Sequence, residues 1–208
     1  MFIITSPYER ITALTDVFLG ILAAWGAAQL FAYADFRHQV WAWTFGLLAV
    51  ASFLGAIAHG FAMSQKTNDR LWLPINLLLG LVLGLFVVGA FFDLSGEGVA
   101  RKALPVMIAL GFGFFLVTVW KPGTFMTFIA YEALAMFFAL GVYGYLFFTS
   151  NLAGIGWMVL GVFVTIIAAV VQATGKAGKS IFWYFDNNGV FHLIQMVGIV
   201  LLFVGLKR

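Results

Sequence analysis

Seven long apolar runs dominate this chain and constrain what it can fold into. Short polar or glycine-containing segments separate them, and each run is close to the ~20 residues that a helix needs to cross a membrane. The runs do not alternate between apolar and polar residues, which favours helices over barrel strands. We therefore expect an all-α, seven-transmembrane helix bundle formed by one domain, residues 1–208. The expected spans are 11–34, 39–63, 71–92, 103–120, 125–149, 154–174 and 184–206.

The composition supports a surface that faces lipid. Hydrophobic residues make up 63% of the chain and charged residues only 9%, whereas soluble domains carry about 25% charged residues. The 11 basic residues are scattered among short loops, so they indicate membrane flanking and no nucleic-acid partner. The absence of cysteine excludes disulfides and thiolate metal sites. We expect an integral membrane protein whose partners are membrane lipids and other membrane-protein subunits. Its orientation is left open because the basic residues divide almost evenly between the two sides.

Polar side chains inside the expected spans are the informative exceptions. Each costs at least a few kcal/mol in a bilayer unless it has a partner or faces a polar cavity. When the spans are placed alternately up and down, most of these side chains fall on the side of the N-terminus. The sequence therefore predicts a polar cavity on that side. The residues concerned are Glu9, Thr12, Asp16, His59, Asp69, Asn76, Glu132, Gln172, Asp186, Asn188, His192 and Gln195.

Helical spacing places several of these residues on common faces. Asn188, His192 and Gln195 follow i, i+4, i+7, and Ser52 and His59 lie seven apart, so each set shares one helix face. Taken singly, each residue has an ordinary explanation: His59 as a hydrogen-bonded interior histidine, Asp69 as a helix cap, or Glu132 as a carboxyl group bonded to a neighbouring helix. Their convergence predicts a functional site.

Four spans carry an ordered set of residues. The first contains a Glu-led segment that ends in glycine, the second ends in histidine, the third begins after an aspartate, and the seventh begins with Asn-x-x-x-His. These residues are Glu9, Thr12, Thr15, Asp16, Gly20, His59, Asp69, Asn188 and His192. The set resembles the motifs of the CREST superfamily of seven-span membrane proteins, which includes the alkaline ceramidases and the progestin and adipoQ receptors. The resemblance implies a zinc-dependent hydrolase of a lipid amide or ester.

Two positions depart from the CREST pattern. Gly55 stands where the family has a serine four residues before His59, so Ser52, one turn deeper, is the substitute. Asn188 replaces the first histidine of the last motif. The zinc site that the resemblance implies would then consist of His59, His192 and a carboxylate, either Asp186 or Asp69. In that site a carboxylate would accept the proton of the zinc-bound water, and Asn188 would stabilise the oxyanion.

Other functions compete with the hydrolase. The missing serine and histidine equally predict a non-catalytic subunit of a membrane complex, or a receptor-like scaffold with a degenerate site. A single haem bound by His59 and His192 is a further candidate, and a proton pathway through Glu132, Asp16 and His192 is another. A retinal-binding protein is excluded, because the seventh span contains no lysine for the Schiff base.

Overall fold

The computed structural model describes residues 2–120 and 125–208, and seven long helices account for most of them. Each of the seven is long and apolar enough to cross a membrane, which confirms the prediction of an all-helical bundle with seven such segments. The connection expected at residues 121–124 lies outside the described residues. In chain order the elements are β1 (Phe2–Ile3), α1 (Pro7–Phe31), α2 (Phe36–Gly60), β2 (Phe61–Ala62), α3 (Gln65–Ser95), α4 (Glu97–Trp120), α5 (Phe125–Thr149), α6 (Ile155–Thr174) and α7 (Asn187–Leu206).

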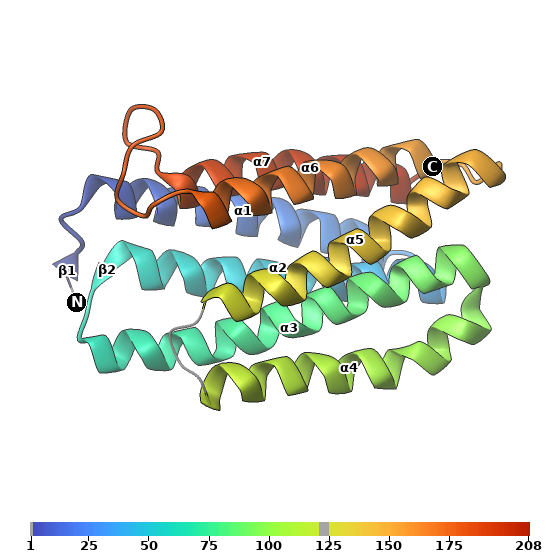
Figure 1. The fold of residues 1–208 in the computed structure, drawn as a ribbon, viewed down its shortest axis with the longest axis horizontal. Coiled ribbons are helices and arrows are strands. Elements are labelled where there is room, and N and C mark those ends of the chain that lie inside the picture. The colour runs from blue at the N-terminus through green and yellow to red at the C-terminus, as the bar shows by residue number, and fades with distance from the viewer. Residues whose placement is uncertain (1, 121–124) are drawn as a thin grey trace.

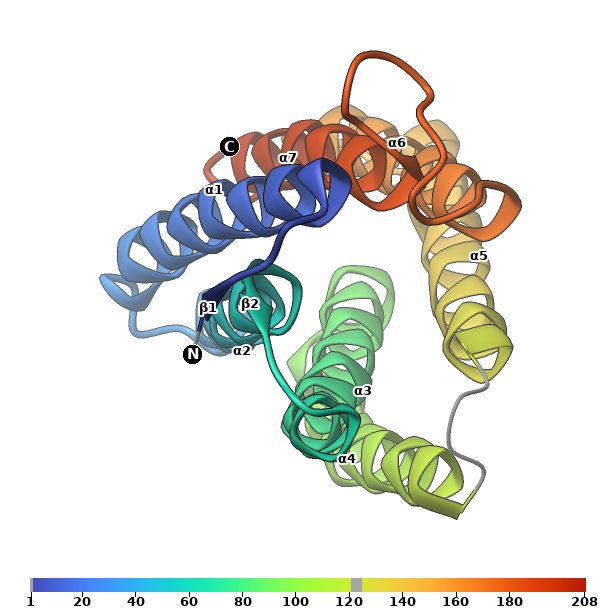
Figure 2. The ribbon, with the colours of Figure 1, turned by 90° about the vertical axis from the view of Figure 1, so that its left-hand side faces the viewer.

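The helices run roughly along one axis, and the two termini lie at opposite ends of the bundle (Figure 1). Helix α1 packs between α2 and α7, α3 packs on α2, and α6 packs on α7. Helix α4 packs almost entirely on α3, at the outside of the bundle (Figure 2). Strands β1 and β2 pair antiparallel beside the start of α1. We call this side, which also holds the connection between α6 and α7, the N-terminal end.

Polar residues that precede the apolar runs set where several helices begin. Ser6 caps α1 and Pro7 occupies its first turn, Asp35 caps α2, Ser64 caps α3 and Asp186 caps α7. Each of these side chains accepts a backbone N–H that the first helical turn leaves without a partner. The first three helices therefore begin before the starts expected from hydropathy at residues 11, 39 and 71, and α7 begins after residue 184.

The prediction of a loop from Asp93 to Lys102 is wrong. Helix α3 continues to Ser95, α4 begins at Glu97, and only Gly96 separates them. Gly96 has φ +80°, a positive value that glycine adopts without strain, and α3 ends there. Asp93 lies within α3, where its charge is paired with Arg37 from α2, and the charged residues that follow lie within α4.

Close helix contacts surround a core that runs through the bundle. Trp41, Phe45 and Tyr143 are fully or almost fully buried in it. Helices α3 and α4 approach each other closely at Gly80 and Gly111. A Cβ atom at Gly80 would lie 2.8 Å from the carbonyl oxygen of Gly111, so only glycine permits this approach.

Candidate functional site

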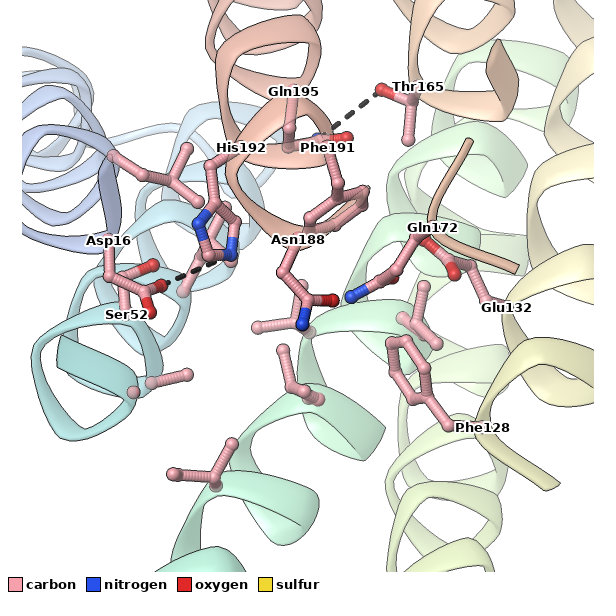
Figure 3. A pocket seen from close by; sticks show the side chains of 18 of the residues that line it. Asp16, Ser52, Phe128, Glu132, Thr165, Gln172, Asn188, Phe191, His192 and Gln195 are labelled. Carbon is pink, nitrogen blue, oxygen red and sulfur yellow. Dashed lines mark hydrogen bonds and ion pairs between the residues drawn. The ribbon is translucent and has the colours of Figure 1, made fainter. Parts of the chain in front are cut away.

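A cavity of about 460 Å³ lies among α1, α2, α3, α5, α6 and α7. Gly175 and Ala177, from the connection between α6 and α7, form part of its wall and place one end of the cavity at the N-terminal end of the bundle. Polar side chains gather toward that end, several of them labelled in Figure 3. Toward the other end the wall is mostly apolar and includes Phe45, Phe86 and Leu202. The cavity therefore has a polar part and an apolar part.

Asp16 and His192 form a buried acid–base pair on the cavity wall (Figure 3). Nε2 of His192 lies 3.3 Å from Oδ1 of Asp16, and Nδ1 lies 2.9 Å from the hydroxyl oxygen of Thr15. Both members of the pair are less than 10% exposed. Thr15 also lies 2.8 Å from the carbonyl oxygen of Thr12, so its single hydroxyl hydrogen serves either that oxygen or Nδ1. In either arrangement the contact between Nε2 and Oδ1 is attractive only when a proton lies on one of the two groups.

His59 lies on the same cavity wall and is held from the other side by Glu9. Nδ1 of His59 is 2.7 Å from Oε2 of Glu9, and the ring packs edge-on against Trp72. Glu9 is partly exposed at the N-terminal end and does not line the cavity. Glu9 therefore orients the imidazole of His59 without reaching the cavity itself.

Asp186 is a structural cap and is not available as a ligand. Its Oδ1 accepts the backbone N–H groups of Asn188 and Gly189 at 3.1 Å and the hydroxyl of Thr12 at 3.4 Å. Its Oδ2 accepts the backbone N–H of Gly178 at 2.8 Å. Four donors thus occupy this carboxylate, which ties α1, α7 and the connection between α6 and α7 together.

The remaining expected residues divide between the cavity and the surface. Ser52 is buried and lines the cavity, and the side chain of Asn188 points into it from α7 (Figure 3). Asp69 does not line the cavity. It lies exposed in the early part of α3, where it accepts a hydrogen bond from Gln65 at 2.7 Å. Because α3 begins at Gln65, Asp69 belongs to an outer turn beyond the polar end of the cavity.

The described residues do not fit the zinc site that the CREST resemblance implies. They contain no group of three or more His, Asp or Glu side chains arranged to hold a metal ion. Asp186 is fully engaged as a cap, Asp69 is on the surface, and Nδ1 of His59 is engaged with Glu9. Two imidazoles without a third ligand leave a catalytic zinc one protein ligand short.

The side of the cavity formed by α5, α6 and α7 carries several buried side-chain oxygen atoms. Among the described residues, no hydrogen bond reaches the side-chain oxygens Oε2 of Glu132, Oε1 of Gln172, Oδ1 of Asn187 and Oε1 of Gln195. All four residues line the cavity. Buried polar atoms are usually hydrogen-bonded, so four such acceptors around one cavity indicate a polar ligand or water.

Residues 11–208 match the sequence model of DUF6962, a family of unknown function. The chain belongs to the DUF6962 family. No curated protein and no solved structure matches it. The DUF6962 match includes the whole cavity wall, whose first residue in the chain is Asp16 and whose last is Leu202. Glu9, which orients His59, precedes the match. The resemblance to the CREST superfamily stays a prediction.

Thr165 and Asn187 were not candidates from the sequence, and Thr15 was named there only as part of the first motif. Thr15 lies three positions after Thr12, so the two share a face of α1. Thr165 lies seven positions before Gln172 on α6, and both line the cavity. Asn187 follows directly on the cap residue Asp186, which places it in the first turn of α7. Helical spacing therefore predicts the two threonines once the faces of α1 and α6 are known.

Proposed function

We propose that this protein is embedded in a membrane, with its seven helices crossing the bilayer and its two ends at opposite surfaces. The outward-facing side chains support this. Helix α4 has large apolar side chains that are strongly exposed, with Val106 57%, Leu116 63% and Trp120 89% exposed. Apolar surface of this extent is unfavourable in water and favourable in lipid, and helices satisfy their own backbone hydrogen bonds there.

Within the membrane, the cavity is proposed to bind an amphiphile, a molecule with a polar head and an apolar chain. The observation that carries this proposal is a single face of α7. Asn188, His192, Gln195, Ile199 and Leu202 all line the cavity and lie at helical intervals. Leu202 lies fourteen residues after Asn188, about 21 Å along the helix, and over this distance the wall changes from polar to apolar. A ligand that matches this wall is polar at one end and apolar along the rest of its length.

The size and polarity of the cavity suit such a ligand. Its volume of about 460 Å³ falls within the roughly 300–1,000 Å³ typical of ligand sites. The head group would lie at the polar part, where Asp16, His192 and the amide side chains offer hydrogen bonds. The chain would lie against Phe45, Phe86 and Leu202. Binding without turnover corresponds to the receptor-like function considered from the sequence.

The test is to identify what is retained by the protein after purification in a mild detergent. Lipid extraction and mass spectrometry are expected to find an amphiphile that copurifies with the wild type. Leu79→Trp fills the cavity, because Leu79 lines it, and should abolish this copurification. Leu134→Trp adds the same bulk at a side chain that is 73% exposed and should retain the ligand. Equal lipid content in both variants would argue against the cavity as the binding site.

The acid–base pair supports a second candidate function, hydrolysis of the bound amphiphile. The pair of Asp16 and His192 would accept a proton from water as the water oxygen bonds to the carbonyl carbon of an amide or ester. The bond from that carbon to nitrogen or oxygen then breaks, and the same proton passes to the leaving group. No step is assigned to zinc, because the donor set does not fit it.

The two candidates differ in turnover. Incubation with lipid amides and esters, followed by mass spectrometry of released fatty acid, measures hydrolysis directly. In an active protein, Asp16→Asn should abolish turnover while the ligand still copurifies. Asp35→Asn, a change of the same kind at an exposed cap at the other end of the bundle, should leave turnover unchanged. Absence of turnover in the wild type would leave binding as the function.

A further inference from the structure

Glu132 is an acid in the interior of the bundle for which the described residues supply no cation. Its residue is 5% exposed, it lines the cavity from α5, and its Oε2 has no hydrogen-bond partner among the described residues. Among the described residues, the basic side chains on the cavity wall are those of His59 and His192. Both already face acids, Glu9 and Asp16 respectively. A buried acid without a partner is costly at membrane depth, which makes it a marker of function.

Amide oxygens extend this acceptor surface across α6 and α7. The amide nitrogen of Asn187 donates to the backbone carbonyl of Gln172 at 2.8 Å. A flipped amide would set two oxygens against each other, so Oδ1 of Asn187 is an acceptor in the only favourable orientation. The amide nitrogen of Gln195 donates to the hydroxyl of Thr165 at 3.4 Å, and among the described residues its Oε1 has no hydrogen-bond partner.

Figure 3 shows how these side chains are placed. Glu132 projects from α5, Gln172 from α6 and Asn188 from α7, and all three point into the cavity. A ligand group that satisfies this part of the wall must supply several hydrogen-bond donors and must tolerate, or neutralise, a negative charge. A carboxylate or phosphate head group does neither.

We propose that the α5, α6 and α7 side of the cavity binds the primary ammonium group of a long-chain amine. The proposal rests on the proposed function, because it names the head group of the amphiphile that the cavity binds. A primary ammonium carries three N–H donors and one positive charge, which match Glu132 and the neighbouring amide oxygens. An alcohol supplies one donor and no charge, and a quaternary ammonium supplies charge without donors. The chain of the amine lies along the apolar part of the wall.

The experiment compares four twelve-carbon probes, dodecylamine, dodecanol, dodecyltrimethylammonium and dodecanoic acid, with the protein in phosphatidylcholine nanodiscs near pH 7. Binding is counted by native mass spectrometry and checked by the shift in Tm. At this pH the amine is protonated, since alkylammonium groups such as that of lysine have a pKa of about 10.4. Dodecylamine is expected to bind about tenfold to a hundredfold more tightly than the other three, the range for hydrogen bonds to a charged group.

Variants at Glu132 test whether this residue causes the preference for dodecylamine. Glu132→Gln should remove the preference for dodecylamine over dodecanol. Glu132→Met replaces the acid with an apolar chain of similar length, so it should remove the preference and also raise Tm. Glu97→Gln makes the same charge change in an exposed ion pair with Arg101 and should keep the preference.

The outcomes separate this inference from the proposed function. Binding of all four probes with similar affinity, or a preference that persists in both Glu132 variants, overturns the ammonium site and leaves an amphiphile cavity. Tighter binding of dodecanoic acid overturns it as well. If no probe binds and no native amphiphile copurifies, the proposed function and the ammonium site both fail.

Discussion

The carboxylate of Asp16 lies directly against the backbone of Gly55. A Cβ atom at position 55 would lie 3.0 Å from Oδ2 and 3.2 Å from Oδ1 of Asp16. Position 55 is also where the CREST pattern has a serine, four residues before His59. The space that a serine side chain needs is therefore taken by the acid that faces His192. A side chain at position 55 would therefore crowd the carboxylate of Asp16, which would have to shift relative to His192.

Gly55→Ala is expected to push the Asp16 carboxylate away from His192 and to lower stability by about 1–3 kcal/mol, the usual cost of overpacking. Gly55→Ser should do the same, even though it restores the serine of the CREST pattern. The measurement is Tm in detergent together with retention of the proposed amphiphile. Gly141→Ala is the control, because a Cβ at that helical glycine meets nothing within 4 Å. A Gly55→Ser protein with normal Tm and ligand content would contradict the relationship.

Thr15 should stabilise the fold through His192 as well as through its own helix. Thr15→Val removes the 2.9 Å contact with Nδ1 of His192 and leaves a buried imidazole nitrogen without its partner. Loss of one partner in a buried hydrogen bond costs about 1–3 kcal/mol. Thr118→Val is the matched control, because Thr118 makes the same bond to the carbonyl three residues back but contacts no histidine. We expect a larger fall in Tm for Thr15→Val than for Thr118→Val. Equal falls would show that the contact with His192 does not contribute to stability.

The seven-helix architecture was predictable because it depends on local hydropathy, whereas the helix ends depended on caps. Asp93 shows the difference. A charge at the end of an apolar run resembles the start of a loop, but Asp93 lies inside α3 because Arg37, from α2, neutralises it. That partner is 56 positions away in the chain, and no local pattern identifies it.

The candidate site was predictable only as far as helix direction and spacing decide it. Asp16, His59 and His192 lie on one cavity wall because alternate helices return polar residues to the same end. Asp69 does not, because α3 starts at Gln65 and places it on an outer turn. Asp186 caps α7, so its carboxylate is already hydrogen-bonded there. The positions of Asp69 and Asp186 both depend on hydrogen bonds at the starts of helices, and these cannot be inferred from hydropathy.

A buried ion pair at the other end of the bundle should dominate the stability of the α2, α3 and α5 contacts. Nε of Arg37 lies 2.7 Å from Oδ1 of Asp93, whose side chain is 1% exposed, and the hydroxyl of Tyr143 donates to Oδ2 at 3.2 Å. Arg37→Met leaves this acid buried and unpaired, so we expect a loss of about 3–5 kcal/mol, measured as a fall in Tm. The double variant Arg37→Met with Asp93→Leu should recover much of the loss.

The exposed pair of Glu97 and Arg101 is the comparison for the buried one. Its side chains are 49% and 61% exposed, so solvent screens the pair, and Glu97→Gln should change stability by less than about 1 kcal/mol. A double variant of Arg37 and Asp93 that is no more stable than Arg37→Met alone would show that the unpaired charge is not what destabilises the single variant.

Asp186 should control how firmly the connection between α6 and α7 is held over the polar end of the cavity. Asp186→Ala removes the cap of α7 and also frees the N–H of Gly178 and the hydroxyl of Thr12. Loss of a cap alone costs about 0.5–2 kcal/mol. Because the variant also releases the connection, we expect faster trypsin cleavage after the exposed residues Lys176 and Lys179. Mass spectrometry of the fragments measures the rate of cleavage at each site.

Asp35→Ala separates loosening of the connection from general destabilisation. Asp35 caps α2 as Asp186 caps α7, but it is 53% exposed and its bonds go to the neighbouring His38. The Asp35 variant should lower Tm without raising the cleavage rate at Lys176 and Lys179. If both variants accelerate cleavage equally at equal Tm, the connection opens with the whole fold and Asp186 acts only as a cap. Selective cleavage in Asp186→Ala would mean that this carboxylate has two functions. Its Oδ1 caps α7, and its Oδ2 holds the connection in place beside the cavity.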